Sequence, residues 1–104
     1  MPGQISLHAR FNAQEGKGAE LAAILQELID LVQQEEGAKF YSLNRGREDQ
    51  SDVVWFYEIY EDMAAMDAHG KFPEFGAVFA RAREVMDGGP ELIRSDVVGF
   101  FSRV

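Results

Sequence analysis

The chain has 104 residues, 46% of them hydrophobic, a net charge of −8 and no cysteine. This length fits a single domain, 1–104, with one core. The negative charge argues against nucleic acid or an anionic membrane as partner, because both would repel it. The lack of cysteine excludes disulfides, thiolate nucleophiles and iron–sulfur ligation. Neither a signal-peptide pattern nor an apolar run of membrane-spanning length is visible, so the protein is expected to be cytoplasmic.

The first two predicted elements are a strand and an amphipathic helix. In ISLHARF (5–11), apolar and polar residues alternate, which is typical of a strand. Residues 19–36 predict a helix, because apolar side chains recur at helical spacing: Leu21, Ile24, Leu25, Leu28, Leu31 and Val32. Gly37 is expected to end this helix. Glu35 and Glu36 lie unfavourably near its negative end.

Two more strands, two helices and a last strand follow. AKFYSLNRGRE (38–48) and VVWFYEIY (53–60) predict the second and third strands. Asp62 is expected to cap a short helix through residue 69, and Pro73 to begin another. Residues 91–104 predict the last strand. The order β-α-β-β-α-β predicts an α+β sandwich of the ferredoxin-like type. The apolar stripe expected in the last helix is Phe75, Val78, Phe79, Ala82 and Met86.

The third predicted strand indicates a homodimer. Both of its faces are largely apolar, whereas the helices of a ferredoxin-like fold cover only one face of the sheet. We expect the chain to supply no cover for the other face. A second subunit that packs sheet against sheet is therefore predicted.

The two faces of the third strand can be assigned from its one charged residue. The first strand is expected to turn its apolar set toward the helices and Arg10 toward the dimer face. Glu58 is predicted to share the dimer face and to pair with Arg10, because a buried carboxylate needs a partner. Trp55 and Tyr57 would then point toward the helices, where a pocket can form.

His69 is the side chain best placed for catalysis. It ends the short predicted helix, just before Gly70, and imidazole exchanges protons near neutral pH. The same position also suits a favourable contact with the helix C-terminus, which is the simpler interpretation of a lone histidine there. The chain has only two histidines, far apart, and no nucleotide or flavin motif. No metal site and no bound cofactor are therefore expected.

Five aromatic residues on or near the predicted sheet are candidates for substrate binding. They are Trp55, Tyr57, Phe72, Phe75 and Phe79. Several rings around a small sheet would suit a flat aromatic ligand, and Tyr57 could donate a hydrogen bond to a phenolic oxygen. Core packing remains the simpler interpretation of any single ring.

The segment WFYEIYEDMAAMDAHGKFPEFGAVF (55–79) resembles the third strand and following helix of the antibiotic biosynthesis monooxygenase family. Family members show a Glu, an aromatic residue two positions later, an acidic turn, an Ala-rich stretch and a His. The matching positions here are Glu58, Tyr60, Asp62, Ala64–Ala65 and His69. Element order and length agree over essentially the whole chain. The resemblance implies a dimeric α+β barrel, with a pocket between sheet and helices in each subunit.

For function, the resemblance implies a cofactor-independent monooxygenase that oxidises a quinol-like aromatic with dioxygen. A base would remove a proton from a dihydroxyaromatic, and the electron-rich anion would reduce dioxygen directly. His69 would be the base or the oxyanion partner, with Tyr57 orienting the substrate. Haem degradation is not expected, because the three positions used by the haem-degrading branch hold Ala9, His69 and Phe79.

Two alternatives stay open. One is a non-catalytic dimeric module that binds a ligand. The other is an isomerase of the same fold acting on a phosphorylated ligand, which would require arginines that point into the cavity. The candidates for that role are Arg10, Arg45, Arg47 and Arg94.

Overall fold

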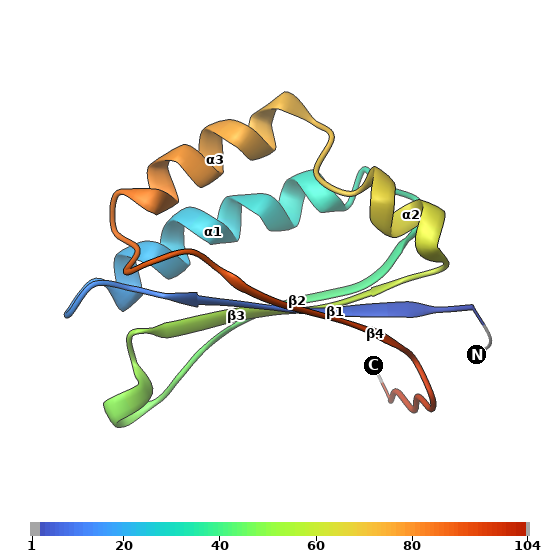
Figure 1. The fold of residues 1–104 in the computed structure, drawn as a ribbon, viewed down its shortest axis with the longest axis horizontal. Helices are drawn as coiled ribbons and strands as arrows, with labels where there is room; N and C mark the ends of the chain where they lie inside the picture. The colour runs from blue at the N-terminus through green and yellow to red at the C-terminus, as the bar shows by residue number, and fades with distance from the viewer. Residues whose placement is uncertain (1–2, 104) are drawn as a thin grey trace.

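A four-stranded antiparallel sheet carries its helices on one face in the computed structural model, which describes residues 3–103 (Figure 1). The sheet order is β2-β3-β1-β4, so β1 and β3 are central. This is the predicted α+β, ferredoxin-like arrangement, and the expected short helix is present as α2. The elements are β1 (Ile5–Asn12), α1 (Gly18–Val32), β2 (Ala38–Arg45), a 3-10 turn (Glu48–Gln50), β3 (Val53–Tyr60), α2 (Met63–Ala68), α3 (Pro73–Arg83) and β4 (Glu91–Asp96).

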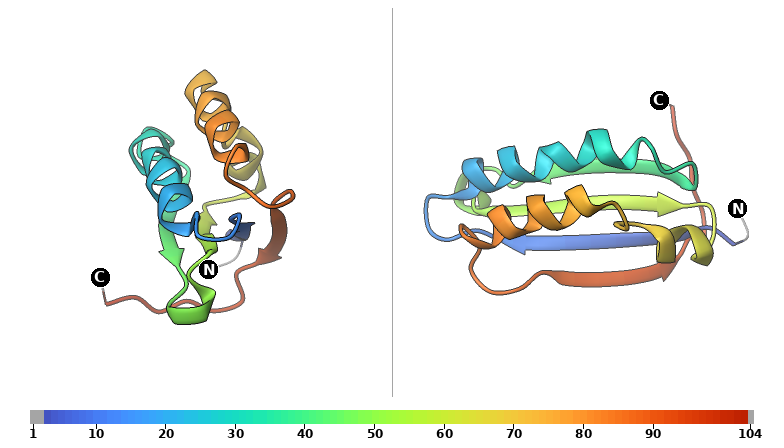
Figure 2. Two further views of the ribbon diagram at one scale, coloured as in Figure 1. Left: turned by 90° about the vertical axis from the view of Figure 1, so that its left-hand side faces the viewer. Right: turned by 90° about the horizontal axis from the view of Figure 1, so that it is seen from above.

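The core lies between the sheet and the helices α1 and α3, which run side by side above it (Figure 2). The apolar stripe of α1 turns inward as predicted, and Leu21, Leu25 and Leu28 are fully buried. The apolar set of β1 also meets the helices. β4 lies beyond the helical layer, and all six of its residues are exposed. None of the helices in residues 3–103 is long and apolar enough to cross a membrane.

Four predicted element ends are wrong. Strand β2 ends at Arg45 rather than at residue 48, and helix α3 ends at Arg83, so Met86 lies beyond it. Helix α1 ends at Val32 and gives way to a turn before Gly37, so Gly37 does not end the helix. Its role is close packing: a Cβ at Gly37 would lie 2.4 Å from the Cβ of Ala65 in α2. The last strand ends at Asp96 rather than at residue 104.

Residues 97–103 cross beneath one end of the sheet, on the face that carries no helix (Figure 2). The backbone N–H of Val97 donates to the carbonyl oxygen of Gln4, and the ring of Phe100 lies 6.4 Å from that of Phe40 on β2. The expectation that the chain supplies no cover for this face is therefore wrong at that end.

The predicted face assignment of β3 is also wrong. In the β1–β3 pairing, Glu58 stands opposite Leu7, which faces the helices. Residues directly opposite in a ladder share a face, so Glu58 points toward the helices, and Trp55 and Tyr57 point to the open face. The alternation of residues along β3 could not show which set faces the helices, because both sets are largely apolar. The expected pairing with Arg10 fails because Arg10 lies on the other side of the sheet.

We predict that Gly37→Ala destabilises the fold by about 1–3 kcal/mol, because the added methyl group must push α2 away from the turn. Gly76→Ala is the matched control. Gly76 lies on the exposed side of α3, where an added Cβ would meet no atom within 4 Å. Alanine at this position should therefore stabilise the helix by about 0.5–1 kcal/mol. Chemical denaturation of both variants checks this. Equal stability of the Gly37→Ala variant and the wild type would contradict the close packing.

Candidate active site

A hollow of about 380 Å³ lies between the sheet and the helices. Its floor includes Ala9 at the centre of the sheet, between Phe56 on β3 and Leu92 on β4 in the strand register. The small Ala9 side chain leaves room that a larger residue would fill. A pocket between sheet and helices was expected, and the structure has one there, although Phe79 is the only one of the five predicted rings that lines it. The aromatic residues that line it are Phe11, Tyr41, Phe56 and Phe79.

The wall of this cavity holds His69, placed there by helix α2. Asp62 caps the start of α2 by accepting a hydrogen bond from the N–H of Ala65 (2.8 Å), as predicted. At the other end, His69 is the C-cap residue, and its extended backbone leads the chain away from the helix axis. The imidazole can therefore reach back to the cavity wall.

Glu35, which follows α1, fixes the orientation of the His69 ring. Its Oε1 lies 2.9 Å from Nδ1 of His69, and its Oε2 accepts a hydrogen bond from the N–H of Gly70 at 3.2 Å. An ionised carboxylate only accepts hydrogen bonds, so Nδ1 carries the proton in this contact. Nε2 is then the nitrogen with a free lone pair, available as a base.

A buried carboxyl group lies next to this imidazole. Glu58 is only 2% exposed, and its Oε1 accepts a hydrogen bond of 2.5 Å from the hydroxyl of Tyr60. The same oxygen lies 3.5 Å from Nε2 of His69. Burial raises the pKa of Glu58 above its ordinary value, an effect that the Tyr60 hydrogen bond and His69 partly oppose. Glu58 therefore holds a proton more readily than an exposed glutamic acid.

Aromatic rings surround the imidazole and hold it in place. The ring centroids of Tyr60, Phe75 and Tyr41 lie 5.2, 5.3 and 5.8 Å from that of His69. Burial raises the pKa of both tyrosines, so their hydroxyl groups stay protonated. His69 is thus a fixed group on a largely apolar wall.

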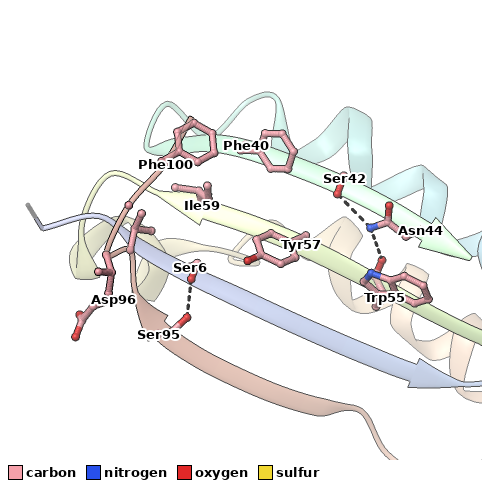
Figure 3. Close-up of a pocket in the computed structure, with 13 residues that line it drawn as sticks. Ser6, Phe40, Ser42, Asn44, Trp55, Tyr57, Ile59, Ser95, Asp96 and Phe100 are labelled. Carbon is pink, nitrogen blue, oxygen red and sulfur yellow. Dashed lines mark hydrogen bonds between the residues drawn. The ribbon is translucent and has the colours of Figure 1, made fainter. Parts of the chain in front are cut away.

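The structure separates the predicted substrate-binding residues. Phe79 lines the cavity, whereas Phe75 is buried with its ring edge-on to His69. Phe72 stacks on Phe75 and lines a separate groove beside Glu35. Trp55 and Tyr57 lie on the opposite face of the sheet (Figure 3).

The open face carries a second hollow, of about 530 Å³, which is partly covered by residues 97–100. Figure 3 shows Trp55, Tyr57 and Ile59 in a row along β3, with Phe40 and Phe100 at one end. Tyr57 is 48% exposed. This face therefore combines apolar rings with accessible surface.

Sequence reasoning missed Glu35 and Tyr41 of the helix-side site, and it left open whether Arg94 points into the cavity. Glu35 carried a signal, since an acidic residue at the negative end of a helix calls for a local partner. Tyr41 stands opposite Glu58 in the β2–β3 register and lines the cavity. Arg94 stands opposite Leu7 and lines the cavity from β4, where it forms no ion pair with any residue in 3–103. Within the same residues, no cluster of three or more His, Cys, Asp or Glu side chains could hold a metal ion.

The chain matches the model of the family described as antibiotic biosynthesis monooxygenase over residues 4–81. No curated protein matches the chain.

Solved structures extend the comparison. A Caulobacter crescentus protein assigned to the antibiotic biosynthesis monooxygenases is 30% identical, with a TM-score of 0.82 over 93% of this chain and 92% of that chain. A Shewanella oneidensis protein is 31% identical, with a TM-score of 0.78 over 91% and 93%. SnoaB, a cofactor-independent oxygenase from Streptomyces nogalater, is 16% identical, with a TM-score of 0.78 over 93% and 95%. That last likeness shows the fold alone.

We predict that Glu58→Gln is more stable than the wild type at neutral pH, by a margin that grows with pH. Folding raises the pKa of Glu58. The stability that this side chain contributes is therefore complete at pH values below its pKa in the unfolded chain, and it is lost as the pH rises through its pKa in the folded protein. Glutamine still accepts the Tyr60 hydrogen bond but never ionises. Thermal melting from about pH 4 to about pH 8 measures the difference.

Glu61→Gln is the control for this measurement, because Glu61 is an exposed carboxylate that contacts Lys39 at the surface. Its stability difference from the wild type should stay small at every pH. A Glu58→Gln advantage that stays constant or shrinks as the pH rises would contradict the raised pKa.

Proposed function

We propose that this chain, which belongs to the antibiotic biosynthesis monooxygenase family, is a cofactor-independent monooxygenase that oxidises a quinol-like aromatic with dioxygen. One observation carries the proposal. An imidazole with its Nδ1 held by a carboxylate stands in the wall of a hollow lined with aromatic rings. The volume of about 380 Å³ falls in the range of small-molecule sites and suits a substrate of one or two rings.

The first step is proton removal by His69. Nε2 takes the proton of a phenolic hydroxyl group, while Glu35 holds the ring and stabilises the imidazolium that forms. The phenolate that remains is electron-rich. Aromatic side chains line the cavity around it, and a bound substrate displaces water from its charge, which strengthens the interactions of that charge with the protein.

The substrate anion itself supplies the electrons for the oxygen chemistry. Its ring carbon next to the phenolate bonds to dioxygen, and a peroxide anion forms on that carbon. Protonation, loss of the C–H proton and cleavage of the O–O bond then give a carbonyl group and water. In total, a quinol and dioxygen become a hydroxyquinone and water, so all four electrons come from the quinol.

Arg94 favours a second candidate function. It lines the same cavity without an ion partner among residues 3–103, and a guanidinium group binds phosphate or carboxylate well. A binding module or an isomerase for a phosphorylated ligand would use it in this way. In the monooxygenase proposal, Arg94 instead faces an oxygen atom of the aromatic substrate. The ring-lined wall favours the aromatic ligand.

We also propose that the protein works as a homodimer, joined through the open face of the sheet. Tyr57, Ile93 and Phe100 on this side are 48%, 62% and 53% exposed, and Val98 is almost fully exposed. Apolar surface of this extent is typical of an interface. A second copy seated on it would bury both the strand row and residues 97–103.

We predict that His69→Ala lowers quinol-dependent oxygen uptake by at least about 100-fold, because the base is lost. Oxygen-electrode assays with a panel of one- and two-ring quinols measure this. Lys71→Ala, an exposed change two residues away, should keep wild-type turnover. Wild-type turnover in His69→Ala would contradict the role of His69.

The same panel separates the two candidate functions. If the wild-type protein takes up no oxygen with any quinol but binds a sugar phosphate, and Arg94→Ala abolishes that binding, the second candidate is correct.

We predict that the wild-type protein sediments at micromolar concentration with twice the mass of one chain. Tyr57→Glu should shift it toward the monomer, because a charge on the open face opposes burial. Gln26→Glu places the same charge on the exposed side of α1 and should leave the dimer intact. A wild-type monomer at this concentration would contradict the interface.

A further inference from the structure

Glu58 is a buried carboxyl group that takes no part in the proton removal proposed for His69. It lines the helix-side cavity, is 2% exposed and forms no ion pair with Lys or Arg in the described residues. Its contacts are the hydroxyl of Tyr60 at 2.5 Å and Nε2 of His69 at 3.5 Å. A carboxylate buried without a cationic partner is costly unless it binds a proton, and groups of this kind cluster at functional sites.

The proposed reaction needs an acid at a later step. Once the substrate anion has bonded to dioxygen, the outer oxygen of the peroxide carries a negative charge. That oxygen must receive a proton before the O–O bond can break to release water. His69 has just accepted the phenolic proton and is held by Glu35 on its other nitrogen. A second group that bears a proton and faces the same cavity would complete the step.

We propose that Glu58 is this second catalytic residue, the acid that protonates the peroxide anion. The inference rests on the proposed monooxygenase function. Before the reaction, His69 and Glu58 hold one transferable proton between them, in addition to the Nδ1 proton. Two titratable groups with different surroundings in one cavity are the usual arrangement for an acid and a base.

The protons balance over one turnover. His69 gains the phenolic proton at Nε2, and Glu58 gives its proton to the outer peroxide oxygen. The O–O bond then breaks, and the departing hydroxide combines with the proton lost from the ring carbon to form water. Finally, Nε2 of His69 returns its proton to Glu58 across the 3.5 Å contact. Both residues are then as they were, and no other reductant or proton source is used.

The charges around Glu58 bear on its titration. His69 favours the ionised carboxylate, whereas Glu35 opposes it. Tyr41 and Tyr60 remain neutral hydroxyl groups. Arg94 lies across β1 from Glu58, since both stand opposite Leu7, and their backbones are roughly 10 Å apart at ordinary strand spacing. Besides these, Asp67 lines the same cavity from α2.

Glu58→Gln tests the inference. The variant keeps the shape of the side chain and an acceptor for Tyr60, but it has no proton to give. We expect the kcat for hydroxyquinone formation to fall at least about 100-fold, with a small change in KM. The wild-type rate should be bell-shaped in pH, because the pair works with one shared proton. The residual activity of Glu58→Gln should not fall at high pH, because the group whose deprotonation causes the alkaline limb of the wild-type profile is absent. Glu61→Gln, on the exposed surface after β3, should match the wild type.

Tyr60→Phe is an independent second variant. Its hydroxyl group lowers the pKa of Glu58, so its removal should raise that pKa and move the alkaline limb to higher pH. An unmoved limb, or a Glu58→Gln variant with wild-type kcat and pH profile, would overturn the role of Glu58 while the wild-type activity stands. Absence of quinol oxidation in the wild type would instead overturn the proposed function itself.

Discussion

The structure depends on how one carboxyl group, Glu58, is accommodated beneath the helices. An isolated charge there would cost several kcal/mol, so the side chain must find hydrogen-bonding partners or hold a proton. Tyr60 supplies a hydroxyl two residues along β3, and His69 approaches from the end of α2. Glu35, just after α1, then holds the other side of the imidazole. This chain of contacts connects the sheet to two helix ends.

The cavity follows from the same layer geometry. Two helices cover a sheet of four strands, and β4 extends beyond them. A small residue, Ala9, lies at the centre of the floor, and rings of Phe56 and Phe79 stand around it. The result is a largely apolar hollow, with Tyr41, Glu58 and Arg94 along one row of the sheet and His69 at the end of α2. Such a site suits a flat molecule with one reactive oxygen, and this fits the proposed monooxygenase function.

Much of the fold could be predicted from periodicity. The stripe of α1, the Asp62 cap and Pro73 at the start of α3 are local signals, and all three are confirmed. The face of β3 was not predictable in this way, because both of its residue sets are mostly apolar. Only the register with β1 shows that Glu58 points toward the helices.

The candidate site was predictable only in part. His69 could be singled out because it ends the short helix just before Gly70 and imidazole exchanges protons near neutral pH. Its partner Glu35 is 34 residues away and meets it only when the ends of α1 and α2 converge. Arg94 joins the cavity by its register on β4, which a weakly patterned strand does not reveal.

The most direct test of the central claim is a carbon-13 NMR titration of the Glu58 side-chain carboxyl group in the folded protein, assigned by comparison with Glu58→Gln. The buried contacts predict that this carboxyl group titrates above the range of an ordinary glutamic acid and senses the protonation of His69. Titration of Glu58 at or below the ordinary range, independent of His69, would contradict the account.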